Sequence, residues 1–133
     1  NMNISLDRLD EAHAALLSET KALIELASHT LMNYLQDQNL QTLESLPNQI
    51  REIAGAMLFL NAENGQAALS TTADFIQSRI ESATALSADD VNRVLDPLAS
   101  ADMLIDNLKS KQPVLQSMFK VALDSSQKLK TVA

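Results

Sequence analysis

The sequence has no cysteine and no tryptophan, and it contains only two glycines and 3% aromatic residues. The absence of cysteine excludes a disulfide framework, a thiolate metal site and a thiol nucleophile. A β-sheet is built largely from β-branched and aromatic side chains, whereas leucine and alanine, which are plentiful here, favour helices. We therefore predict an all-α protein that forms a single domain over residues 1–133.

Long apolar runs are also missing. No stretch approaches the ~20 residues that a membrane span requires, and no secretory signal is visible. We therefore expect a cytoplasmic protein without membrane insertion. The formal net charge is −7 and the isoelectric point lies near 4.6, which argues against binding to nucleic acids or anionic membranes. The expected partners are other proteins.

Apolar residues recur in steps of three and four through most of the chain, which is the period of an amphipathic helix. This pattern predicts helices over residues 6–34, 43–60, 69–83, 91–108 and 113–129. Pro47 either kinks the second helix or lies in the first turn of a restarted one, and Pro97 is expected to kink the fourth. Because the connections are short, we expect an antiparallel up-and-down bundle of four main helices, followed by a C-terminal helix.

Local signals mark several boundaries of these helices. Residues 61–65 are expected to form a tight turn between the second and third helices. Ser87, followed three residues later by Asp90, imitates a capping box at the start of the fourth helix. Pro113 is expected to start the fifth. The first helix, at about 30 residues and 1.5 Å per residue, predicts a rod of roughly 45 Å, which suits one side of a bundle.

Motifs for most kinds of chemistry are absent. The sequence has no glycine-rich phosphate loop and no spacing of His, Asp and Glu that is typical of a metal site, so we predict neither a cofactor nor a metal. Of the two histidines, His13 lies on the inward stripe of the first helix and is expected in the core. His29 falls on the outward side of that stripe, where a partner can reach it.

His29-Thr30-Leu31 resembles the opening of the His-Thr-Leu-Lys-Gly signature of histidine phosphotransfer (HPt) domains. Such domains are four-helix bundles in which a solvent-facing histidine carries a phosphoryl group. A nearby lysine offsets the phosphate charge, and a glycine one turn later lets a receiver domain approach. In this register Met32 stands at the lysine position and Asn33 at the glycine position.

A second register of the same signature lies in the second predicted helix and takes Gly55 as the motif glycine. It places Arg51 at the histidine position and Ala54 at the lysine position. Residues 60–62, Leu-Asn-Ala, then stand where the family has Leu-Gly-Ala. An arginine stays protonated and has no free lone pair for phosphoryl capture. This register therefore implies an HPt-like fold without phosphotransfer chemistry.

The three-four periodicity of the second predicted helix places the residues of this register on its outward side. This side is therefore a candidate docking surface. The predicted docking residues are Arg51, Ala54, Gly55, Leu58 and Phe59. Leu58 and Phe59 are expected to be apolar residues on an accessible flank, where a helix without a partner carries lysine or glutamate. A glycine inside a helix costs about 0.5–1 kcal/mol relative to alanine, and the close approach of another surface is the usual reason for one.

This pattern is similar to one branch of the family. The long first helix, the segment 55–60 and Ala67-Ala68-Leu69 resemble HPt-like domains of type IV pilus chemosensory proteins. Those are the N-terminal region of ChpA-type hybrid histidine kinases and the stand-alone FimL family. The resemblance implies a non-catalytic scaffold or docking module in a two-component pathway that governs twitching motility. The implied partners are a response-regulator receiver, a kinase or a pilus-associated signalling protein.

Two other functions remain as alternatives. One is active phosphotransfer through His29, and it is the exception to our prediction that the protein is not an enzyme. The other is a structural helical bundle without signalling chemistry, which forms a homodimer through the long first helix.

Overall fold

The structure, a computed structural model, describes the backbone of residues 2–132 and the side chains of residues 10–115 and 117–130. This part of the chain contains no strand and folds into five α-helices and two short 3₁₀ helices. The α-helices are α1 (Met2–Asp37), α2 (Leu46–Phe59), α3 (Glu63–Glu81), α4 (Ala88–Lys109) and α5 (Lys120–Val132), and the 3₁₀ helices are η1 (Leu40–Leu43) and η2 (Gln116–Phe119). The prediction of an all-helical protein is confirmed.

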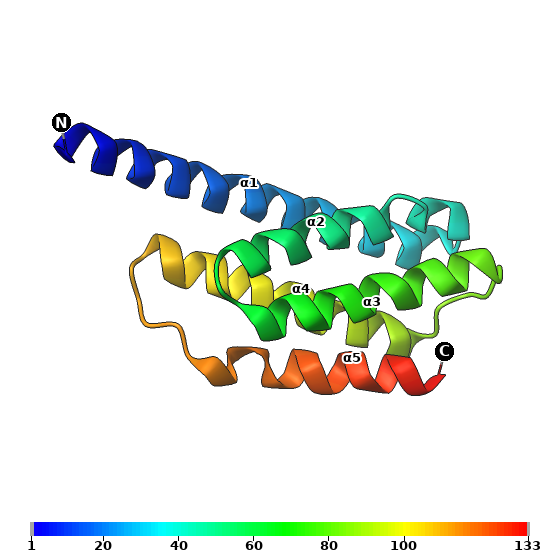
Figure 1. Ribbon diagram of the computed structural model, residues 1–133. Coiled ribbons are helices and arrows are strands. Elements are labelled where there is room, and N and C mark those ends of the chain that lie inside the picture. Colours follow the sequence, from blue (N-terminus) through cyan, green and yellow to red (C-terminus); the bar gives the residue numbers. More distant parts are fainter. Residues whose placement is uncertain (1, 133) are drawn as a thin grey trace.

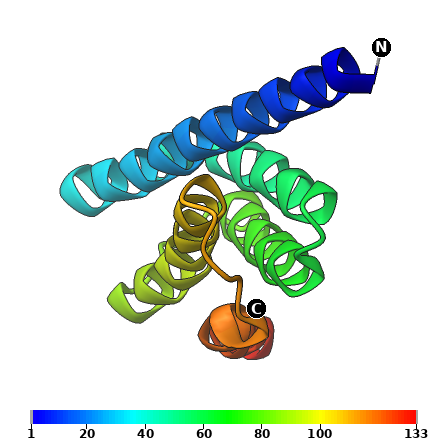
Figure 2. The ribbon, with the colours of Figure 1, turned by 90° about the vertical axis from the view of Figure 1, so that its left-hand side faces the viewer.

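Successive α-helices run in alternating directions along the molecule (Figure 1). α2 and α4 both pack against α1 and against α3. α5 packs against α3 and α4 on the side that faces away from α1 (Figure 2). α1 is the longest helix, and its N-terminal part projects beyond the ends of the other helices (Figure 1).

The core forms where the apolar stripes of the helices meet. On α1 the buried residues are Leu17, Thr20, Ile24, Ala27, Thr30, Leu31 and Tyr34. Tyr34 is fully buried, and its hydroxyl oxygen accepts a hydrogen bond from the backbone N–H of Leu86 at 3.0 Å. This bond gives the buried phenol a polar partner and joins the C-terminal end of α1 to the loop before α4.

The N-terminal end of α1 differs from the prediction. The helix begins at Met2 rather than at residue 6, and His13 is exposed rather than buried in the core. The helical stripe does pass through position 13, but His13 lines an open groove between α1 and the segment formed by Leu108, Lys109 and Lys111. The stripe residues Leu6 and Leu9 lie outside the described side chains.

The three prolines have different roles in the fold. Pro47 is the second residue of α2, so the chain restarts a helix there instead of kinking one. Its missing N–H costs no helical hydrogen bond at that position. Pro97 lies inside α4, which continues through it from Ala88 to Lys109. Pro113 does not start the fifth helix, because residues 112–115 are irregular and η2 begins only at Gln116.

The start of α4 carries the predicted capping box. The backbone N–H of Asp90 donates to Ser87 Oγ, and the N–H of Ser87 donates to Asp90 Oδ2, each at 3.0 Å. The C-terminal ends of α1, α2, α3 and α4 are each followed by a residue with positive φ, and these residues are Gln38, Asn61, Ala83 and Lys111. Glycine is the usual residue in that conformation, yet both glycines of the chain lie inside helices.

The turn between α2 and α3 is shorter than the predicted segment 61–65, since α3 already begins at Glu63. Asn61 adopts a left-handed conformation with a φ of 62°. Its N–H donates to the carbonyl of Leu58 at 3.1 Å, and the N–H of Ala62 donates to the carbonyl of Met57 at 2.8 Å. These two bonds form a Schellman motif, which satisfies the last carbonyls of α2 and reverses the chain within three residues.

Candidate docking surface

α2 divides its side chains between a buried face and an exposed face. Its large buried residues are Leu46, Ile50, Ile53 and Met57. Its exposed residues include Arg51, Gly55, Leu58 and Phe59, which we call the α2 flank. Ala54, which the sequence pattern placed on the outward side, is only 3% exposed. The prediction for Ala54 is wrong because position 54 lies one turn from both Ile50 and Met57 and so shares their buried face.

Arg51 reaches from α2 to α3. Its Nη2 lies 3.4 Å from Asp74 Oδ1, and its Nη1 donates a hydrogen bond to Asn48 Oδ1 at 3.3 Å. The side chains of Arg51 and Asp74 are 41% and 77% exposed. Water screens such a pair, whose contribution to stability is about 0.2–1 kcal/mol at most. The guanidinium is therefore held weakly and stays accessible to an acidic group of another protein.

Gly55 lies one turn after Arg51 on the same face of α2. A Cβ atom added at Gly55 would meet no atom of its surroundings within 4 Å. Its φ is not positive either, so the backbone conformation does not call for glycine. Neither internal packing nor backbone geometry therefore explains a residue that weakens the helix. The space above Gly55 allows another surface to approach the backbone of α2.

Leu58 and Phe59 extend this face with apolar surface, since their exposed fractions are 56% and 76%. The turn that follows them lines a groove of about 480 Å³, together with the end of α4 and the segment around η2. Its larger apolar lining residues include Leu60, Leu104, Leu108, Leu115 and Phe119. Apolar surface thus occurs both on the α2 flank and in the groove at the adjoining end of the molecule.

His29 is exposed on α1 and lines a second groove, of about 390 Å³, between α1 and α4. Glu25, Lys21 and Asp102 line the same groove. Lys21 Nζ lies 2.7 Å from Asp102 Oδ1 and 2.9 Å from Asp106 Oδ1. Hydrogen bonds to these two carboxylates hold the pKa of Lys21 above its usual value. Because that cation is already paired, a phosphoryl group on His29 would lie near acidic side chains without a free cation from Lys21.

The sequence model of one protein family, described as the FimL C-terminal domain, matches residues 7–126. The chain belongs to this family. The comparison with curated proteins and the comparison with solved structures each find no match. The FimL part of the predicted relationship is therefore confirmed, while the likeness to ChpA-type kinases and to HPt domains stays a prediction.

In this FimL C-terminal domain, the described residues contain no cluster of three or more His, Asp or Glu side chains that is suited to a metal ion. No helix in the described part of the chain combines the length and the apolar character needed to cross a bilayer. Sequence reasoning missed Asp74 as the partner of Arg51, because their contact depends on how α2 and α3 pack. The sequence indicated only that Asp74 would be exposed, because it lies on the side of α3 opposite the buried Leu69, Thr72 and Ile76.

Proposed function

We propose that this domain is a non-catalytic docking module for protein partners in pilus-related chemosensory signalling, and that a partner binds at the α2 flank. The observation that carries the proposal is Gly55, an exposed helical glycine above which an added Cβ would meet nothing within 4 Å. The exposed apolar side chains of Leu58 and Phe59 and the accessible guanidinium of Arg51 lie on the same face. Aromatic and arginine side chains are enriched where proteins bind each other.

We take the fold to be an antiparallel up-and-down bundle of the HPt type. The alternating helix directions in Figure 1 support this proposal. The register that takes Gly55 as the motif glycine expects another glycine at position 61, and Asn61 has the left-handed backbone for which glycine is the usual choice. This agreement favours the register in which Arg51 stands at the phosphoacceptor position.

The chemistry of Arg51 makes the flank a binding surface and not a phosphoryl acceptor. A guanidinium stays protonated at physiological pH and has no lone pair with which to attack phosphorus. It donates hydrogen bonds to carboxylates in a planar fork, and its present partner Asp74 is highly exposed and weakly bound. The active site of a receiver domain, which carries several carboxylates, is a suitable counterpart, as is an acidic patch on a kinase or a pilus-associated protein in the cytoplasm.

The test is a binding titration with the receiver and kinase domains of the same signalling system. Gly55→Gln adds a long side chain to the flank without a helix penalty and is expected to lower affinity at least tenfold. Ser78→Gln, at an exposed position of α3, is the matched control and is expected to bind like the parent. Equal affinity of the parent and Gly55→Gln for every partner that binds would contradict docking at this flank.

A second measurement tests the absence of chemistry. Incubation with an active kinase or a phosphorylated receiver is expected to leave the domain unlabelled. The alternative is phosphotransfer through His29, which is favoured by one observation, the exposure of His29 beside the groove between α1 and α4. Acid-labile label that disappears in His29→Gln would establish that alternative in place of the non-catalytic function.

A further inference from the structure

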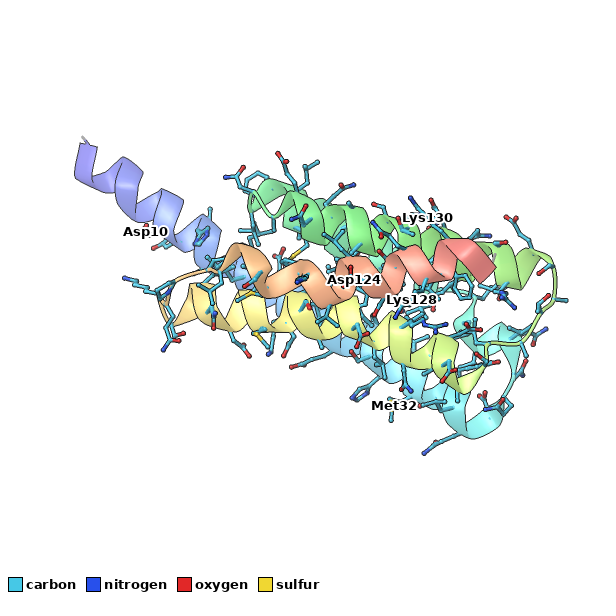
Figure 3. All side chains as sticks on the ribbon, turned by 90° about the horizontal axis from the view of Figure 1, so that it is seen from below. Asp10, Met32, Asp124, Lys128 and Lys130 are labelled. Carbon is cyan, nitrogen blue, oxygen red and sulfur yellow. The ribbon has the colours of Figure 1, made fainter. Side chains whose placement is uncertain are left out.

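A second surface of the domain, on α1, carries almost no charge. Its exposed residues between positions 22 and 36 are Ala22, Glu25, Leu26, His29, Met32, Asn33, Leu35 and Gln36, which we call the α1 face. Only one of these eight, Glu25, is charged at neutral pH. By contrast, four of the six exposed residues described on α5 are charged, and Asp124, Lys128 and Lys130 are labelled in Figure 3. A helix face in contact with water alone normally carries more charge than the α1 face does.

The α1 face also exposes large apolar side chains. The exposed fractions are 52% for Leu26, 51% for Met32 and 37% for Leu35. Figure 3 shows Met32 at the edge of the molecule, on α1. The groove between α1 and α4 runs beside this face. Leu95 and Ala99 form part of its α4 side, and Lys21, Glu25 and Asp102 line it as well. One surface therefore offers both projecting apolar side chains and an adjacent depression.

We propose that the α1 face is the surface through which two copies of this domain associate. With a net charge of −7, two copies repel each other and can approach closely only where each has few charges. A basic partner would gain little at a face with one carboxylate. Two-fold interfaces are self-complementary, and those of homodimers are more apolar than other interfaces. Here each copy supplies an exposed Met32 and a groove that can receive it.

Charge also selects the orientation of the two α1 helices. The N-terminal half of α1 carries Asp10, Glu11 and Glu19, all exposed. A parallel arrangement would bring the two acidic halves alongside each other, and repulsion between like charges disfavours it. An antiparallel arrangement centred near His29 instead directs the acidic halves away from each other. It also withdraws His29 from solvent at the centre of the pair.

The dimer is expected to be weak, because eight positions on one helix are fewer than the roughly 20–30 residues per side of a standard interface. Sedimentation equilibrium from about 5 to 500 μM, a range that reports weak association, should show a mass that rises from 14.5 kDa towards twice that value. Added salt should increase the mass, because it screens the repulsion between copies. A mass of 14.5 kDa at every concentration would overturn the proposal, as would dissociation by salt, which indicates contacts between acidic and basic groups.

Charge substitutions locate the interface. Met32→Glu is expected to reduce dimer formation at least tenfold, because it places two further carboxylates in the contact. Leu58→Glu is the matched control, since Leu58 on α2 is 56% exposed and Met32 is 51% exposed, and the same charge is added. If Leu58→Glu dissociates the dimer and Met32→Glu does not, the copies meet at the α2 flank and the proposal is wrong.

The absence of cysteine allows a direct test of orientation. Under mild oxidation, His29→Cys is expected to give covalent dimers, because position 29 lies near the two-fold axis. Ala22→Cys alone is expected to remain monomeric, whereas a mixture of Ala22→Cys and Gln36→Cys should cross-link. Efficient cross-linking of Ala22→Cys with itself would indicate parallel helices and overturn the antiparallel arrangement.

Discussion

The two glycines of the chain lie in consecutive helices, and their surroundings are opposite. A Cβ added at Gly65, in α3, would lie 2.7 Å from Cε1 and Cζ of Phe119, a side chain that is 4% exposed at the end of η2. A Cβ added at Gly55, in α2, would meet nothing within 4 Å. A glycine in the interior of a helix, such as Gly55, costs about 0.5–1 kcal/mol relative to alanine, whereas Gly65 lies in the first turn of α3. The packing of Phe119 explains Gly65, whereas no contact made by the described residues explains Gly55. This difference is why we assign the approach of a partner to Gly55 alone.

The largest expected change in stability comes from removing the Phe119 ring, which occupies the space next to Gly65. Phe119→Ala should lower the free energy of unfolding by about 3–5 kcal/mol, because it leaves a cavity where η2 and the start of α5 meet α3. Urea denaturation measures the change. Leu115→Ala, in the same segment but 62% exposed, is the control and should change stability by no more than about 0.5 kcal/mol. A loss below about 1 kcal/mol for Phe119→Ala would contradict the packing role.

Gly65→Ala should have the next largest effect. Overpacking costs about 1–3 kcal/mol, and the better helix propensity of alanine offsets about 0.5–1 kcal/mol of it, so the domain should lose up to about 2.5 kcal/mol. In the Phe119→Ala background the same substitution should become stabilising, because the obstructing ring is gone. A double-mutant cycle measures this reversal, and strict additivity of the two substitutions would contradict direct contact.

Gly55→Ala should act in the opposite direction and raise the free energy of unfolding by about 0.5–1 kcal/mol, since alanine favours the helix and meets no neighbour. Thermal or urea denaturation measures the gain. The same variant should bind a partner no better than the parent despite its higher stability. A loss of stability would show that an unrecognised contact within the domain requires glycine at this position.

The smallest expected effect comes from placing glycine where the backbone is left-handed. Ala83 follows α3 with a φ of 52°, a conformation that costs an L-residue about 1–2 kcal/mol. Ala83→Gly relieves this strain but increases the entropy of the unfolded chain by about 0.4–1 kcal/mol, so a net gain of about 0.5 kcal/mol is expected. Ala67→Gly, at an exposed position inside α3, is the control and should destabilise. A loss for both variants would indicate that Ala83 is not strained.

The three-four periodicity of the sequence predicted the helices because burial of one stripe per helix forms the core. It was less reliable for positions at the edges of a stripe, as Ala54 shows. Position 54 lies one turn from both Ile50 and Met57, so it shares their buried face although it was grouped with its neighbour Gly55 on the outward side. His13 shows the reverse error, since a residue on the stripe is exposed where α1 extends past most of its neighbours.

Contacts between residues far apart in the sequence were not predictable from local pattern. Gly65 was assigned to a turn because glycine is common in turns, and nothing near it in the sequence indicated that the ring of Phe119 would pack against it. The partner of Arg51, Asp74, was missed for the same reason. The Ser87–Asp90 capping box, by contrast, was predicted correctly because both of its hydrogen bonds join residues three positions apart.

The buried phenol of Tyr34 gives the domain a single internal optical probe. It is the only tyrosine in a chain without tryptophan, and its hydroxyl binds the N–H of Leu86. The tyrosine signal in near-ultraviolet circular dichroism therefore reports whether α1 and the loop before α4 remain joined. A partner that binds the α2 flank without rearranging this junction leaves the signal unchanged. A partner that separates α1 from the loop abolishes it, so one spectrum distinguishes rigid docking from a conformational change.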